Sequence, residues 1–204
     1  SNLLKVKTKN IQVISPGLDQ IITSTNTNIF KKYQLPKSYF IYLGSLEPRK
    51  NLKNTIEAFE IFQQNNKQYS LVIAGVKNNQ IFKDIKINDQ KFIKTIGYVD
   101  ERDKHTLFKN SKGLIYCSLY EGFGLPILEA AQAGIPIITS NSTALNEISP
   151  KLALKANPQN PFDIAAKTKQ SLLIKKPDYS KYLNKFSWQK SAEKILETIE
   201  SNFH

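Results

Sequence analysis

Two glutamates flank a glycine-containing loop that leads into a predicted helix. Glu121 opens the segment 121–124, Glu-Gly-Phe-Gly, and Glu129 follows Glu121 by eight residues. Free N–H groups at a helix start attract phosphate, and glycines let a ligand approach the backbone closely. A carboxylate about one turn into the helix can accept hydrogen bonds from sugar hydroxyls. Phosphate and hydroxyls held side by side suggest a nucleotide-sugar ligand.

A second polar loop follows a predicted strand and carries two adjacent cations. The loop spans 44–51, Gly-Ser-Leu-Glu-Pro-Arg-Lys-Asn, and Arg49 and Lys50 stand just before a predicted helix. Arginine can grip phosphate oxygens bidentately, whereas lysine acts as a point charge. Ligands of open parallel sheets bind beyond the carboxyl ends of the strands. We therefore expect both cations to face the Glu121 loop and to bind phosphate.

Strand-like and helix-like segments alternate along the chain and must position these loops. Apolar runs predict strands over 39–43, 70–74, 92–96, 113–117 and 135–139. Periodic apolar residues and helix signals predict helices over 51–65, 79–87, 100–110, 125–134, 144–148, 160–174 and 188–202, with Asn51 and Asp100 as N-caps. Continuously apolar strands are typical of a parallel sheet covered on both faces. The predicted fold class is α/β, with a Rossmann-like parallel sheet and helices on both faces.

Composition narrows the classes of protein. The chain has 204 residues and a net charge of +12, but its lysines are scattered, and no platform of aromatic and basic residues indicates nucleic-acid binding. A weak attraction to an anionic membrane surface stays open. The single cysteine fits a reducing compartment, and we expect a cytoplasmic protein without a secretory signal. Peripheral association with the inner face of the membrane stays open.

Several familiar ligand motifs are missing. The pattern that begins at Gly122 and Gly124 has Ile127 where a dinucleotide-binding fingerprint needs a third glycine. The sequence contains no Gly-Lys-Ser/Thr and no Asp-x-Asp, and two histidines with one cysteine do not make a zinc site. We therefore expect no metal and no cofactor, with Arg49 and Lys50 supplying the positive charge that a diphosphate needs.

Four blocks in combination resemble the C-terminal half of a GT-B glycosyltransferase of family GT4. The blocks are 44–51, 97–99, 121–129 and 186–188, and the segment 13–19 resembles the stretch with which this half begins. The resemblance covers residues 11 to about 200, and the spacing of the two glutamates matches the family's E-x7-E motif. It implies one donor-binding domain over 1–204, an acceptor site on an N-terminal domain absent from this chain, and terminal helices over 178–204 that pack toward that domain.

The resemblance also implies roles for individual residues. Glu121 would lie beside the donor sugar and support the charge at its anomeric carbon, while Arg49 and Lys50 would stabilise the leaving diphosphate. Glu129 would accept hydrogen bonds from the ribose. The remaining implied contacts to the donor come from the loops: Gly44 and Ser45 at the phosphates, Tyr98 and Val99 beside the base, and Gly122, Phe123, Gly124 and Leu125 around the phosphates at the helix start. Many relatives have an arginine where Ser45 stands, which leaves the phosphate geometry open.

Together these features predict the donor-binding domain of a retaining, metal-independent glycosyltransferase. GDP-mannose is the leading donor and a UDP-sugar follows closely, with a glycan or lipid-linked acceptor in bacterial surface polysaccharide synthesis. We expect the isolated domain to bind a nucleotide weakly and to catalyse nothing. Two alternatives remain: a GT-B sugar-phosphate synthase or phosphorylase, and a non-catalytic module that binds a nucleotide-sugar.

Overall fold

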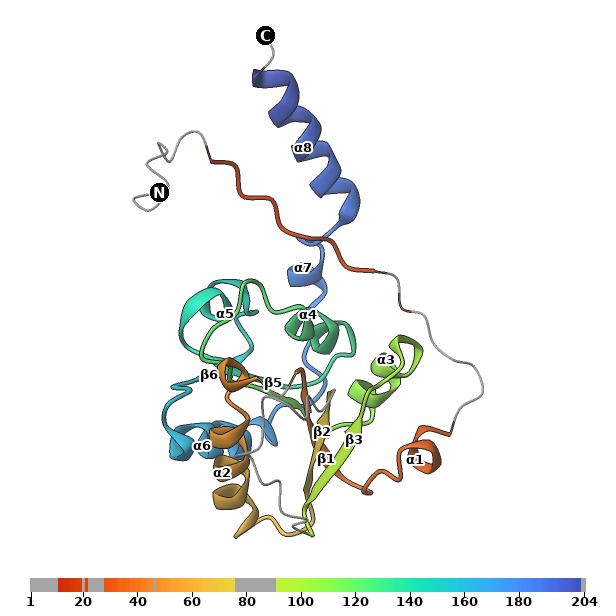
Figure 1. Ribbon diagram of the computed structural model, residues 1–204, viewed down its shortest axis with the longest axis vertical. Coiled ribbons are helices and arrows are strands. Elements are labelled where there is room, and N and C mark those ends of the chain that lie inside the picture. The colour runs from red at the N-terminus through yellow and green to blue at the C-terminus, as the bar shows by residue number, and fades with distance from the viewer. Residues whose placement is uncertain (1–10, 20, 22–27, 46, 76–90, 203–204) are drawn as a thin grey trace. The chain divides into compact units, whose positions relative to one another are not determined.

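The computed structural model describes residues 11–19, 21, 28–45, 47–75 and 91–202 of the chain (Figure 1). The chain divides into two compact units, one formed by Ser1–Gln20 with Ser180–His204 and the other by Ile21–Tyr179. The predicted single domain over 1–204 stays a prediction. The helix predicted over 79–87 lies outside the described residues.

The described residues of the larger unit form a six-stranded sheet in which each strand pair is parallel. The strands lie in the order β3-β2-β1-β4-β5-β6. Their bounds are β1 Tyr39–Leu43, β2 Ser70–Ala74, β3 Ile93–Gly97, β4 Leu114–Tyr116, β5 Ile137–Ser140 and β6 Leu154–Ala156. All five residues of β1 are buried, as expected for a strand covered on both faces. The predicted parallel α/β sheet is confirmed.

Helices cover both faces of this sheet (Figure 1). Neighbouring residues of β1 show the two sides: Phe40 packs edge-to-face on Phe59 and Phe62, whereas the Tyr39 hydroxyl donates to the carbonyl of Leu107, 2.7 Å away. The helices among the described residues of this unit are α1 Ile29–Lys32, α2 Leu52–Gln63, α3 Glu101–Lys109, α4 Leu125–Gln132, α5 Thr143–Ile148 and α6 Pro161–Ser171, with a 3-10 turn at Pro48–Lys50. Helices α2 and α6 contact each other on the Phe40 side, and α3 and α4 contact each other on the opposite side.

The strand order places a topological switch point in the middle of the sheet. From β1 the chain proceeds to β2 and β3 on one side, and then crosses to β4, β5 and β6 on the other. Loops that leave the two central strands in opposite directions diverge, and ligands of such sheets bind at this switch point. The two strands at this point are β1 and β4, which precede the loops that carry Lys50 and Glu121.

Asn51 ties these two loops together and occupies the predicted N-cap position of α2, but its side chain does not cap the helix. It precedes α2 in the left-handed conformation, with φ 59°, and its side chain makes no capping hydrogen bond. Its amide instead donates to the carbonyls of Cys117, at 2.9 Å, and Pro158, at 2.6 Å. Asp100, by contrast, caps α3 as predicted and accepts a hydrogen bond from the backbone N–H of Arg102. Tertiary partners therefore decide what the Asn51 side chain does.

The smaller unit joins the segment 11–19 to the C-terminal helices α7 Ser180–Leu183 and α8 Trp188–Asn202. Trp188 Nε1 donates to Asp19 Oδ1 over 2.8 Å, and Ser191 Oγ donates to the carbonyl of Ser15 over 2.6 Å. A side chain at Gly17 would collide with Trp188, so glycine permits this close approach. The described helices include none that is long and apolar enough to cross a membrane.

We predict that replacing Asn51 destabilises the larger unit. Asn51→Ala leaves the Cys117 carbonyl without its amide donor, removes one of the two amide donors to the Pro158 carbonyl, and places alanine at a positive φ. The free energy of unfolding therefore falls by roughly 2–3 kcal/mol. Asn51→Gly removes the same hydrogen bonds without the strain and loses less stability. Denaturant unfolding measures both effects. Asn110→Ala, which deletes an exposed amide bonded to the Thr106 carbonyl, is the control; an equal loss in all three variants would contradict the bridging role.

Candidate functional site

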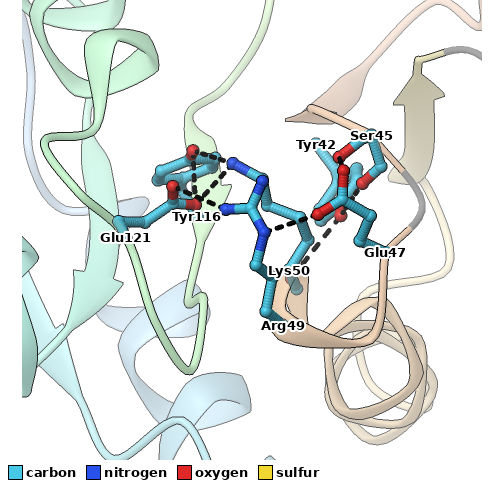
Figure 2. Close-up of polar contacts among 7 residues, drawn as sticks. All are labelled: Tyr42, Ser45, Glu47, Arg49, Lys50, Tyr116 and Glu121. Atoms are coloured by element: carbon cyan, nitrogen blue, oxygen red, sulfur yellow. Dashed lines mark hydrogen bonds and ion pairs between the residues drawn. The ribbon is translucent and has the colours of Figure 1, made fainter.

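Glu121 lies at the switch point in a cluster of mutual hydrogen bonds (Figure 2). Its Oε1 accepts from Lys50 Nζ at 2.6 Å and from the Tyr116 hydroxyl at 2.7 Å, and Lys50 Nζ also donates to that hydroxyl at 2.9 Å. Glu121 is 6% exposed and Lys50 is 9% exposed. Arg49 reaches Glu121 Oε2 at 3.3 Å from the surface side. The three predicted catalytic residues therefore converge on one place.

Local geometry explains why Arg49 and Lys50 take different positions. Both lie in the 3-10 turn, which holds the Lys50 side chain inside the molecule and leaves that of Arg49 43% exposed. The backbone N–H of Leu119 donates to the carbonyl of Arg49 at 2.8 Å, so the two loops are also joined through their backbones. Lys50 thus meets Glu121 as a buried charge, and Arg49 meets it at the mouth of the site.

Ser45 belongs to a short relay that ends on Arg49 (Figure 2). Its hydroxyl donates to Glu47 Oε1 at 2.9 Å, and Glu47 Oε2 accepts from Arg49 Nε at 2.5 Å. Ser45 therefore does not provide the positive charge that an arginine at this position would provide. It orients the carboxylate that holds Arg49.

The environment keeps Glu121 ionised. Burial raises its pKa, but hydrogen bonds from Lys50 and Tyr116, together with the charge of Lys50, outweigh burial, and the net pKa lies below the ordinary glutamate value. Burial and the neighbouring Glu121 carboxylate raise the pKa of the Tyr116 hydroxyl, which stays protonated as a donor. The cluster therefore combines an ionised carboxylate, which forms an ion pair with Lys50, and a phenol that stays neutral.

The glycine loop after Glu121 turns sharply into α4. Gly124 has φ 105°, and a Cβ there would lie 2.6 Å from Leu145 Cδ2, so the position demands glycine. Leu125 begins α4 and is 48% exposed, and Gly122 is exposed as well. Phe123 lies between them and is half-buried. The start of α4, with its positive dipole end, therefore lies immediately after the Glu121 cluster along the chain.

A pocket of about 270 Å³ lies beside this cluster at the carboxyl ends of β1 and β2. It contains four of the predicted donor-binding residues, of which Tyr98 is 71% exposed and Val99 is buried. The lining residues are Leu43, Gly44, Ser45, Ala74, Gly75, Tyr98, Val99, Glu101 and Lys104. The pocket thus brings together the loop after β1 and the loop before α3.

Lys104 connects this pocket to the second glutamate of the motif. Its Nζ lies 2.8 Å from Glu129 Oε1 and 2.9 Å from Glu101 Oε1. Burial lowers the pKa of Lys104, but hydrogen bonds to Glu129 and Glu101 outweigh burial and the net pKa is raised. Glu129 Oε2 is a buried oxygen without a hydrogen-bond partner among the described residues. Glu129 is therefore linked to the pocket by its ion pair with Lys104, which lines the pocket. Its contact with a ribose stays a prediction.

Sequence reasoning missed three residues of this site: Tyr116, Glu101 and Lys104. Tyr116 ends an otherwise apolar strand, and its polar hydroxyl is the feature of the sequence that could have indicated a site residue. Lys104 lies four residues after the helix cap Asp100, so its direction depends on how α3 packs. Among the described residues, no group of three or more histidine, cysteine or acidic side chains is arranged to hold a metal.

Comparison with known proteins shows the family. The family described as glycosyl transferases group 1 matches residues 25–185. O-antigen chain mannosyltransferase B of Escherichia coli is 33% identical over 150 residues, which cover 71% of this chain and 39% of that protein. The E. coli serotype-specific mannosyltransferase WbdA is 30% identical over 168 residues, which cover 78% of this chain and 21% of that protein. The chain thus spans less than half the length of these relatives.

Solved structures share the fold. The crystal structure of Anabaena HepE in complex with UDP and glucose superimposes with a TM-score of 0.77 at 17% identity, over 98% of this chain and 59% of that one. Sucrose-phosphate synthase from Thermosynechococcus elongatus gives 0.71 at 17% identity, over 94% of this chain and 52% of that one. These likenesses confirm the predicted fold class, the C-terminal half of a GT-B fold.

The fold and the family match together define the class of the chain as that of the GT-B glycosyltransferases. Within that class, the chain belongs to the glycosyl transferases group 1 family. The predicted resemblance is therefore confirmed at the level of the family, and the roles of the individual site residues stay predictions.

We predict that Glu121→Gln destabilises the protein in a pH-dependent way. The pKa of Glu121 is lower folded than unfolded, so the ionised carboxylate adds stability above its ordinary pKa of about 4.3, and this contribution disappears as the pH falls through the lower, folded pKa. The variant should lose roughly 2 kcal/mol at pH 7, and the difference from wild type should shrink in acid.

Urea unfolding at a series of pH values measures this difference. Glu57→Gln, at an exposed position of α2, should follow the wild type throughout. A penalty for Glu121→Gln that stays constant from neutral to strongly acidic pH would show that the carboxylate charge contributes no stability.

Proposed function

We propose that this chain is the donor-binding part of a retaining, metal-independent glycosyltransferase. The full protein would transfer mannose from GDP-mannose to a glycan or lipid-linked acceptor in bacterial surface polysaccharide synthesis. The acceptor would bind to an N-terminal domain that is not in this chain, toward which the terminal helices would pack. The proposed place of action is the cytoplasm, with peripheral association at the inner face of the membrane.

One observation carries this proposal: a buried carboxylate in direct contact with two cations at the switch point of the sheet. Departure of a nucleoside diphosphate builds negative charge, which the fixed charges of Lys50 and Arg49 can stabilise. The neighbouring Glu121 carboxylate can stabilise positive charge that develops at the anomeric carbon. Two side-chain cations in one site can take the place of a divalent metal at the diphosphate.

Two lines of support favour mannose and guanine. Two of the relatives are named as O-antigen chain mannosyltransferases, and WbdA is named as a serotype-specific mannosyltransferase. The pocket also presents a carboxylate, Glu101, and an ammonium, Lys104, at 2.9 Å from each other. Guanine carries N–H donors next to the acceptors O6 and N7, so this pair of charges is complementary to its edge. HepE was solved with UDP, which keeps a UDP-sugar as the second candidate donor.

A sugar-phosphate synthase is the second candidate function. A probable sucrose-phosphate synthase of Thermosipho melanesiensis is 26% identical over 206 residues, which cover 93% of this chain and 47% of that protein. Such an enzyme would use the same donor site with a phosphorylated sugar as acceptor. An assay of the full protein with paired acceptors, a hexose 6-phosphate against an unphosphorylated mannose oligosaccharide, separates the two functions.

We predict metal-independent binding of GDP to this chain. Calorimetric titration in EDTA should give the same affinity as titration with magnesium, with GDP bound more tightly than UDP or ADP. Arg49→Ala and Glu129→Ala should each weaken binding by about tenfold, the loss expected for one charge-assisted hydrogen bond.

Two exposed positions that do not line the pocket provide matched controls. Lys169→Ala and Glu57→Ala remove one charge of each sign from helix surfaces and should leave the affinity unchanged. Binding that requires magnesium would contradict the metal-independent site. Nucleotide binding that survives both Arg49→Ala and Glu129→Ala would place the donor elsewhere.

A further inference from the structure

Tyr116 is the third member of the Glu121 cluster, and neither the motifs nor the family match assigns it a role. It is the last residue of β4, is 1% exposed, and ends in a hydroxyl within 2.9 Å of Lys50 Nζ and 2.7 Å of Glu121 Oε1 (Figure 2). The Lys50 ammonium also lies 5.3 Å from the centre of the Tyr116 ring. One buried side chain therefore contacts both charged groups.

Packing alone does not require the hydroxyl. The neighbours of Tyr116 in the strand, Leu114 and Ile115, are fully apolar, and phenylalanine would fill the same volume. A buried hydroxyl costs free energy unless it is hydrogen-bonded, and this one donates to a carboxylate and accepts from an ammonium. Its position is therefore best explained by the two charges that it joins.

The hydroxyl changes what Lys50 can do when an anion arrives. An ammonium has three N–H donors, and two of those of Lys50 go to Tyr116 and Glu121. If Glu121 depended on Lys50 alone, movement of Lys50 toward a phosphate would leave a buried carboxylate oxygen without a donor. Tyr116 donates to that same oxygen, so Glu121 keeps a hydrogen bond while Lys50 shares its charge with a ligand.

We propose that Tyr116 is a positioning residue of the donor site, whose hydroxyl holds Glu121 in place and so frees Lys50 to bind the diphosphate of the donor. This proposal rests on the proposed function, because it takes a nucleoside diphosphate as the ligand of Lys50. Tyr116 acts through Glu121 and Lys50 and does not itself contact the sugar.

Tyr116→Phe tests the proposal because it removes the hydroxyl and keeps the ring. Tyr39→Phe is the matched control: Tyr39 is fully buried in the adjacent strand β1, and its hydroxyl donates to the carbonyl of Leu107 instead of to a site residue. Thermal unfolding of both variants shows that each is folded and how much stability each loses. If both variants are folded, a difference in GDP affinity between them is caused by the change in the site.

The first measurement needs no ligand. Carbon-detected NMR titration of the Glu121 side chain should show a higher pKa in Tyr116→Phe than in wild type, because one stabilising hydrogen bond to the carboxylate is gone, and no change in Tyr39→Phe. An unchanged Glu121 titration in Tyr116→Phe would overturn the proposal, whatever the nucleotide experiments show.

The second measurement is GDP affinity by calorimetry. Tyr116→Phe should bind GDP about tenfold more weakly than wild type. The double variant Tyr116→Phe with Glu121→Gln should lose less binding free energy than the sum of the losses in the two single variants. Tyr39→Phe should bind like wild type. Equal affinities for Tyr116→Phe and Tyr39→Phe would overturn the proposal. If wild type binds neither GDP nor UDP, the proposed function fails, and the Glu121 titration still decides whether Tyr116 holds that carboxylate.

Discussion

The buried contact between Lys50 and Glu121 is the constraint on which the site depends. Two charges removed from water are costly unless hydrogen bonds satisfy them, and here the loops after β1 and β4 must stay close for the contact to exist. Asn51 and the backbone bond between Leu119 and Arg49 supply that closeness without using charge. These uncharged hydrogen bonds therefore fix the distance between the two loops, and the charged side chains remain available to a ligand.

The two glutamates of the motif have parallel environments. Glu121 is held by Lys50 from the loop after β1, and Glu129 is held by Lys104 from α3. Each lysine lies at or beside the proposed ligand position, so each carboxylate both neutralises a cation in the free protein and can accept hydrogen bonds from a ligand. The eight-residue spacing places one glutamate before α4 and the other within it, which separates the sugar end of the proposed site from its nucleoside end.

The sequence predicted the parts of the fold that local patterns determine. The bounds of β1, β2 and α8 agree with the prediction, because continuous apolar runs and a periodic helix face are local signals. Strand β6, Leu154–Ala156, was missed because three residues with an exposed lysine at the centre carry no such signal. Asn51 lies at the predicted N-cap position, but its side chain does not cap α2 because its hydrogen-bond partners lie far along the chain. The convergence of Glu121 with Arg49 and Lys50 was predictable from strand topology, whereas the contact of Lys104 with Glu129 required the packing of α3 on α4.

The charge balance of the cluster suits a leaving group better than a tightly held ligand. Arg49 and Lys50 carry two positive charges, and Glu47 and Glu121 carry two negative charges in contact with them. A diphosphate that enters must compete with these carboxylates for the cations, so ground-state binding is moderated. In the proposed reaction, charge on the diphosphate would increase as the bond to the sugar breaks, so the cations would bind it more strongly, and the adjacent carboxylate would stabilise the cationic sugar. Interactions that strengthen only in the transition state are those that accelerate a reaction.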